Sequence, residues 1–172
     1  PLPPPPPRPT LFRSSAASDV YKRQRRQDSG GVGENRGGLG AVYEIELLEE
    51  EAKAFIFGER SKFAPTGVVG GGDGALNKFS YEHQNEFKSP PLASKMVNIS
   101  LSKGQAVRLE TPGGGGYGKA YKRKIDSVLN DVKLEYISSA LASSEYGVVI
   151  NDEGEVDEGK TFASRIKIRQ TR

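Results

Sequence analysis

Apolar and polar residues alternate along several stretches of the chain, as they do in a β-strand with one buried face. In residues 41–48, Tyr43, Ile45 and Leu47 share one face. Residues 53–57 follow the acidic turn at 49–51 and bring three large apolar residues in a row, which indicates a more buried strand. We therefore expect residues 41–57 to form a first β-hairpin.

A second pair of strands is predicted further along the chain. Residues 96–101 alternate, residues 102–104 (Ser-Lys-Gly) supply a turn, and residues 105–110 return. This pattern predicts a second hairpin, which leads into a run of glycines.

The apolar period changes from strand to helix after residue 120. Ile125, Val128, Leu129 and Val132 have the spacing of one helical face. Further signals are a serine cap at Ser138 or Ser139 for a helix to about Glu145, a short strand at 147–150, and Asp157 as N-cap of a last helix with Phe162 and Ile166. The predicted class is α+β: β-hairpins with long Gly-rich loops, then a small helical C-terminal tail.

Glycine is concentrated at the end of the second hairpin. Pro112 is followed by Gly113, Gly114, Gly115 and Gly116. One interpretation is a flexible linker, although linkers usually mix Gly with Ser. The other is backbone that needs φ > 0 or close approach to another segment, and the preceding strand pattern favours it. Residues 58–77 are also Gly-rich and too poor in apolar residues to pack alone, so we expect a functional or disordered loop.

The first 24 residues differ from the rest. They begin PLPPPPPRP, a polyproline tract that favours an extended, unpacked chain, and residues 11–24 resemble translated sequencing-adapter read-through. The head also accounts for the whole formal charge of +3. We expect three parts: a disordered, non-native head at 1–24, a β-rich part at 25–120 and a helical tail at 121–172.

Composition limits the classes of function. The body is neutral, which argues against nucleic-acid binding. The chain has no cysteine, so disulfides, thiolate zinc sites and a Cys nucleophile are excluded. Without a long apolar run or a signal-peptide pattern, no membrane association and a cytoplasmic location are expected.

Few residues have the setting of a catalytic group. His83 is the only histidine and lies in a polar run, where an exposed, idle side chain is the simpler interpretation. Asp28 and Ser29 precede a Gly-rich turn, and we favour a turn role over a nucleophile pair. No spacing indicates a metal site. The catalytic residues are therefore unknown and no metal site is predicted.

Arg36 and Arg60 lie inside glycine-rich blocks, where backbone amides can face an anion. A guanidinium there could hold a carboxylate, carbonyl or phosphate. It could equally tie two loops together through backbone carbonyls. The candidate residues for substrate binding or loop structuring are Arg36, Gly37, Gly38, Arg60, Gly113, Gly114, Gly115 and Gly116.

Four blocks in one order resemble a known family. They are DSGGVGENRGGLG at 28–40, GERSKFAPTG at 58–67 with GGG at 70–72, ETPGGGGYG at 110–118, and YGVV at 146–149 with Val156, Asp157 and Thr161. In this order they resemble the C-terminal part of the hydantoinase B/oxoprolinase family. Lys119-Ala120 stands where the family usually has Asp-Pro, and Glu59 and Ser61 where Asp and Arg are common.

The resemblance implies a subunit of a cytoplasmic hetero-oligomer. Such enzymes couple ATP hydrolysis to opening the ring of hydantoins or 5-oxoproline, with a hydantoinase A-like ATPase as partner subunit or domain and a small cyclic amide as substrate. It also implies ATP and a divalent metal in the intact complex, none in this chain, and no activity of the chain alone. The alternatives are a fragment of an acetone or acetophenone carboxylase large subunit, or a non-enzymatic β-rich binding module.

Overall fold

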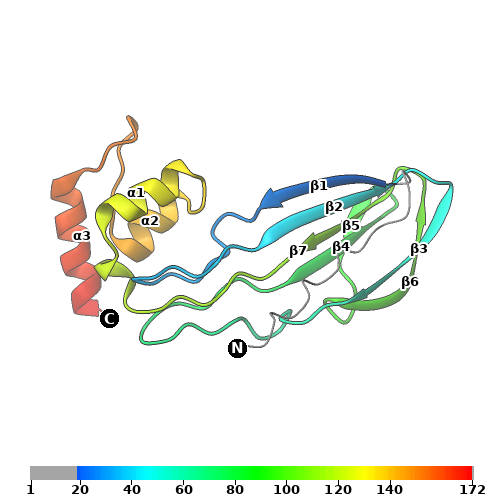
Figure 1. Cartoon of the computed structure of the whole chain (residues 1–172), viewed down its shortest axis with the longest axis horizontal. Coiled ribbons are helices and arrows are strands. Elements are labelled where there is room, and N and C mark those ends of the chain that lie inside the picture. Colours follow the sequence, from blue (N-terminus) through cyan, green and yellow to red (C-terminus); the bar gives the residue numbers. More distant parts are fainter. Residues whose placement is uncertain (1–18, 172) are drawn as a thin grey trace, which may run out of the picture.

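A β-sandwich and a helical bundle occupy opposite ends of the molecule, and extended glycine-rich segments run between them (Figure 1). The computed structural model describes residues 19–171, and the side chains of residues 22–170. Within that range the predicted α+β class and the helical tail are confirmed.

The sandwich has two antiparallel layers. The larger sheet has the order β1-β2-β7-β4-β5, with β1 at Asp19–Arg25, β2 at Ala41–Leu47, β7 at Ala106–Glu110, β4 at Lys78–His83 and β5 at Glu86–Lys88. The smaller sheet pairs β3 at Glu51–Phe57 with β6 at Lys95–Ser102.

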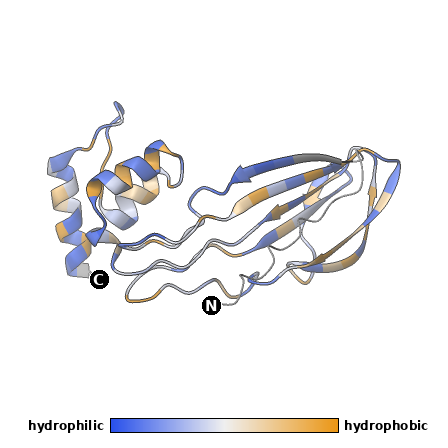
Figure 2. Cartoon of the chain, in the orientation of Figure 1, coloured by the Kyte–Doolittle hydropathy of each residue, from blue (hydrophilic) through white to orange (hydrophobic). Residues whose placement is uncertain are grey.

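The core of the sandwich is filled from both sheets, as the alternating apolar residues in Figure 2 indicate. Leu47 and Phe79 come from the larger sheet, and Ile99 and Leu101 from the smaller one. All four are buried, and removing such side chains from water is the main favourable term in folding.

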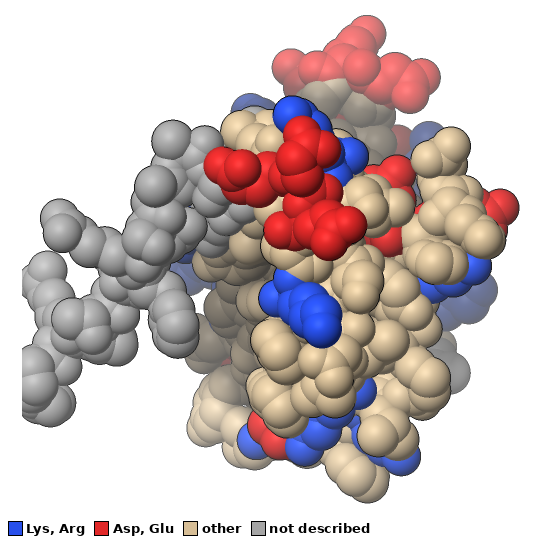
Figure 3. Space-filling model, turned by 90° about the vertical axis from the view of Figure 1, so that its right-hand side faces the viewer, with Lys and Arg blue, Asp and Glu red and all other residues tan. Residues whose placement is uncertain are grey.

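Both predicted hairpins are wrong as pairings, although the strands themselves exist. Strand β2 pairs with β1 and β7, whereas β3 pairs with β6. Each short connection is a corner between the layers, and the two corners bond to each other: the Gly104 amide donates to the Leu47 carbonyl at 2.8 Å and the Lys103 amide to that of Glu50 at 3.1 Å. Crossing between layers brings the apolar faces of consecutive strands together, where a flat hairpin would leave them uncovered. Acidic side chains gather at this end of the molecule (Figure 3).

The burial predicted for β3 is also wrong. Phe55 and Phe57 are 58% and 73% exposed, while Ala54 and Ile56, which alternate with them, pack on the core. The strand is buried on one face only, so period-two alternation decides which side chains face the core.

Strand β1 corrects the boundary of the predicted head. Residues 19–24 pair with β2, with Gln24 opposite Val42 and Arg25 opposite Ala41. Ladder hydrogen bonds use the backbone, and an edge strand tolerates the exposed polar side chains of residues 22–25. The rest of the predicted disordered head, residues 1–18, lies outside the described residues.

The hairpin of β4 and β5 was not predicted. Gln84 and Asn85 connect the two strands with φ of 54° and 62°, the left-handed pair that a two-residue hairpin turn requires. The sequence hides this turn because neither residue is a glycine.

The helical end has the predicted caps. Helix α1 spans Ile125–Lys133, α2 spans Ser139–Tyr146 and α3 spans Glu158–Thr171, with a 3₁₀ turn, η1, at Ala120–Lys122. The Ser138 hydroxyl accepts from the Leu141 amide at 3.1 Å, and the Asp157 carboxylate from the Lys160 amide at 2.9 Å.

Tyr146, Val128, Ile137 and Val148 belong to the hydrophobic core of the helical end. The strand predicted at 147–150 is reduced to one bridge, Ile150 with Val156, because no neighbouring strand is available there. None of the described helices is long and apolar enough to cross a membrane.

Candidate functional site

The glycine-rich segments pack backbone against backbone between the two ends of the molecule. The segment 113–116 is central. Gly31 donates its amide to the Gly114 carbonyl and Gly114 donates to Gly38, both at 2.8 Å, and Gly116 donates to Gly72 at 2.9 Å. The block at 30–40 therefore lies against Gly113–Gly116, and the Gly-rich stretch after Arg60 packs with both. We call these three packed segments the glycine bundle.

Close approach, not a left-handed backbone, is what the central run needs. A Cβ atom at Gly113 would overlap the Ser29 carbonyl, one at Gly115 that of Thr66, and one at Gly116 that of Val32. None of the four central glycines has φ in the left-handed region. Gly114 is the least crowded of the four, with its nearest neighbour 3.3 Å from the added atom.

Asp28 and Ser29 anchor the first glycine segment. The buried Ser29 hydroxyl accepts from the Gly40 amide at 2.8 Å and donates to the Arg26 carbonyl. The Asp28 carboxylate accepts from the Ser138 amide at 2.7 Å. These contacts agree with the turn role favoured above, since a hydroxyl held in this way is not free to attack a substrate.

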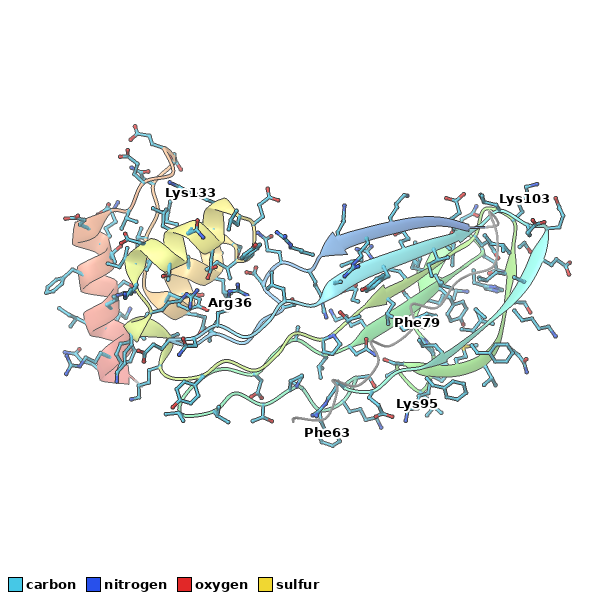
Figure 4. The ribbon with its side chains drawn as sticks, viewed as in Figure 1. Arg36, Phe63, Phe79, Lys95, Lys103 and Lys133 are labelled. Atoms are coloured by element: carbon cyan, nitrogen blue, oxygen red, sulfur yellow. The ribbon has the colours of Figure 1, made fainter. Side chains whose placement is uncertain are left out.

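Arg36 points toward the helical end, where Figure 4 places it below α1. Its Nε donates to the Asp131 carboxylate at 3.1 Å and its Nη1 to the Gly37 carbonyl at 2.8 Å. Arg123 donates to the same carboxylate oxygen at 2.9 Å and to the Glu34 carbonyl at 3.0 Å. We call Arg36, Asp131 and Arg123 the junction triad; it links the glycine segments to α1.

Tyr146 lies beside the triad and is fully buried. Burial raises the pKa of its hydroxyl, and the nearby positive charge of Arg123 opposes that rise. The Gly33 backbone lies close enough to favour the ionised form, but among the described residues no hydrogen bond of normal geometry reaches the hydroxyl.

Arg60 is placed differently from Arg36. Its side chain is exposed, its φ is 62°, and its carbonyl accepts from the Asn77 amide at 2.8 Å. The structure thus brings Arg36, Gly37, Gly38 and the central glycines together and leaves the Arg60 side chain in solvent.

Neither Asp131 nor Arg123 was among the site residues predicted from the sequence. The basic cluster 122–124 reads as the exposed start of a helix, yet the Arg123 side chain is 17% exposed and paired. The available signal was Asp131, a carboxylate three residues from the buried Val128 on one helix, because a charge near a buried face usually has a partner.

The described residues do not fit the divalent metal that the resemblance implies. Within residues 19–171, no group of three or more His, Cys, Asp or Glu side chains converges to hold an ion. His83 is exposed at the turn between β4 and β5.

A family model for hydantoinase B/oxoprolinase matches residues 19–120. The chain belongs to this family. The β subunit of caprolactamase from Pseudomonas jessenii is 32% identical over 150 residues, which cover 85% of this chain and 26% of that protein.

Two solved structures share the fold. The crystal structure of an ATP-dependent caprolactamase from Pseudomonas jessenii has a TM-score of 0.68 at 32% identity and covers 84% of this chain. A nucleotide-free acetone carboxylase has a TM-score of 0.75 at 24% identity over 91% of this chain, a likeness of fold alone. The chain spans about a quarter of the length of these relatives.

Proposed function

We propose that this chain is part of a hydantoinase B-like subunit of an ATP-dependent cyclic-amide hydrolase, and that it has no activity alone. The substrate class is a ring with an internal amide, such as a hydantoin or 5-oxoproline. The partner is a hydantoinase A-like ATPase subunit or domain. ATP and a divalent metal belong to the intact complex.

The observation that carries this proposal is the likeness to ATP-dependent caprolactamase, at 32% identity over 84% of the chain. Caprolactam, hydantoin and 5-oxoproline share the cyclic amide, whose C–N bond has partial double-bond character and resists hydrolysis. Coupling ring opening to ATP hydrolysis supplies the free energy and the activation that this bond requires.

The described residues contribute structure to that complex. The glycine bundle has no room for side chains at its centre, so it is a stiff connection between the sandwich and the helices. The junction triad fixes the helical end to it. We assign no catalytic group to this part.

The test compares the chain alone with an intact complex. The longer polypeptide that contains this sequence, together with its ATPase companion, should release phosphate from ATP in step with ring opening of hydantoin, 5-oxoproline or caprolactam. The 172-residue chain alone should show no turnover, with or without Mg²⁺ or Mn²⁺.

The alternatives predict other outcomes. Carboxylation of acetone with bicarbonate would identify a carboxylase, and companion binding without ATP-dependent chemistry would identify a binding module. Turnover by the chain alone that disappears with His83→Ala would contradict the proposal and make the histidine catalytic.

A further inference from the structure

A basic hollow opens where β1 meets the Arg36 block. Its volume is about 570 Å³, and Arg23, Arg25, Arg36, Gly38, Leu39 and Tyr136 are among the residues that line it. No Asp or Glu is among its lining residues. The wall of the hollow therefore carries arginines and no carboxylate, although the Arg36 side chain is only 14% exposed and pairs with Asp131.

The two arginines nearest the glycine segment are held by the same aromatic ring. The Arg25 guanidinium carbon lies 4.9 Å and that of Arg36 5.2 Å from the centre of the Tyr136 ring. Stacking on an aromatic face restrains a flexible arginine without using its in-plane N–H groups. In Arg36 the Nε–H already donates to Asp131 and Nη1 to the Gly37 carbonyl, so its remaining N–H groups are the ones available to a ligand. Both cations are thus positioned before any ligand arrives.

The charges at this site are only partly neutralised. Asp131 forms ion pairs with both Arg36 and Arg123. Arg25 forms no ion pair among the described residues. Glu135, on the adjoining hollow that Arg25 also lines, forms none either. Arg25, Arg36 and Arg123 set against Asp131 and Glu135 leave one positive charge in excess at the hollow.

Two backbone amides add to the positive character. The Gly38 and Leu39 amides donate to no acceptor in the described part of the chain, whereas the flanking amides of Gly37 and Gly40 are both used. Free amides beside guanidinium groups form the usual protein environment for oxyanions.

We propose that this hollow binds a small oxyanion, a carboxylate or a phosphate, between Arg25, Arg36 and the Gly38–Leu39 backbone. The site goes beyond the proposed function and does not depend on it, since binding is measured on the chain itself. Arg23 also lines the hollow, but it lies in the segment that resembles adapter sequence, so the site is assigned to Arg25 and Arg36.

The experiment is a titration of the ¹⁵N-labelled chain with glutarate and, separately, with pyrophosphate, at constant ionic strength set with chloride. Saturable shifts are expected in the Gly38 and Leu39 amides and in the Nε–H signal of Arg25. Arg25→Gln should weaken binding roughly tenfold through loss of a charge-assisted contact. Arg169→Gln, an exposed arginine on α3, removes the same charge elsewhere and should leave binding unchanged.

A second pair of variants keeps the test independent of Arg25. A Cβ atom at Gly38 would meet nothing within 4 Å, so side chains fit there. Gly38→Glu should abolish binding by like-charge repulsion, while the isosteric Gly38→Gln should weaken it far less.

The outcomes separate the two ligand sources. Binding of glutarate alone identifies a carboxylate site, binding of pyrophosphate alone a phosphate site, and binding of both a general oxyanion site. Absence of saturable shifts with either ligand, or equal weakening by Arg25→Gln and Arg169→Gln, would overturn the proposal.

Discussion

At the scale of single residues, the space beside a backbone atom decides which side chain is allowed. Gly113, Gly115 and Gly116 each face a carbonyl oxygen of another segment, while Gly38 faces open space. The same residue type is therefore obligatory at three positions and replaceable at the fourth, although all four belong to the family-like blocks.

The first prediction concerns the crowded glycines. Gly113→Ala should lower the free energy of unfolding by about 3 kcal/mol or more, because the methyl group must displace the Ser29 backbone. Gly38→Ala should change it by less than about 0.5 kcal/mol. Urea unfolding of both variants measures the difference, and equal stability would return the central run to a flexible linker.

The second prediction concerns the Tyr146 hydroxyl, which is buried and has no hydrogen-bond partner among the described residues. Tyr146→Phe should therefore leave stability at pH 7 unchanged or raise it by about 1 kcal/mol. If Tyr146→Phe instead lowered the free energy of unfolding by more than about 1 kcal/mol, the hydroxyl would have a hydrogen-bond partner.

The pH dependence of the same residue gives the third prediction. Burial raises the pKa of Tyr146 above its ordinary value of 10.0, so the unfolded chain loses this proton first. The stabilising effect is complete below pH 10.0 and disappears as the pH rises through the folded-state pKa. Thermal unfolding between pH 8 and 11 should show a steeper alkaline loss for the wild-type chain than for Tyr146→Phe.

The sequence predicted which segments are special better than it predicted what individual side chains contact. The Gly-rich blocks marked the segments that meet, because backbones that pack directly on each other require glycine, and runs of glycine are easy to recognise in a sequence. The direction of Arg36 could not be predicted, since its partner Asp131 lies 95 positions away and only the fold brings the two together.

At the scale of elements, periodicity located β2, β3, β6 and β7 but not their partners, and it missed β1, β4 and β5. Alternation fixes which side chains of a strand share a face. It does not indicate whether the next strand pairs with it in the same sheet or packs against it in the facing sheet. That is why 41–57 and 96–110 both read as hairpins although each crosses between sheets. Helix caps were predictable because Ser138 and Asp157 bond within their own first turn.

The fourth prediction concerns the attachment of α1 to the glycine segments. Asp131→Asn leaves two largely buried arginines sharing no carboxylate, which should cost about 3 kcal/mol of stability. Asp152→Asn removes an exposed carboxylate from a loop at the same end and should cost less than about 0.5 kcal/mol. Thermal unfolding followed at 222 nm compares them, and equal curves would remove the triad as a structural link.

At the scale of the whole molecule, both ends carry apolar side chains that nothing in the described structure covers. Phe57 is 73% exposed on the outer face of β3, and Phe162 is 70% exposed on α3. Large exposed apolar residues that lie together mark surfaces for association.

The last prediction concerns the outer face of the smaller sheet, which we expect to promote association of chains without contributing to the stability of the fold. Phe55, Phe57 and Val97 are at least half exposed there, so the chain should bind a hydrophobic dye such as ANS and self-associate as its concentration rises. Phe57→Thr keeps a residue that suits a strand and should reduce both effects while changing the free energy of unfolding by less than about 0.5 kcal/mol. Phe79→Ala, in the core at 6% exposure, should instead cost about 3 to 5 kcal/mol. Dye fluorescence and sedimentation measure the exposed apolar face, and urea unfolding measures stability. A Phe57 variant that unfolds as easily as the Phe79 variant would contradict the prediction and show that the outer phenylalanines belong to the core of the folded chain.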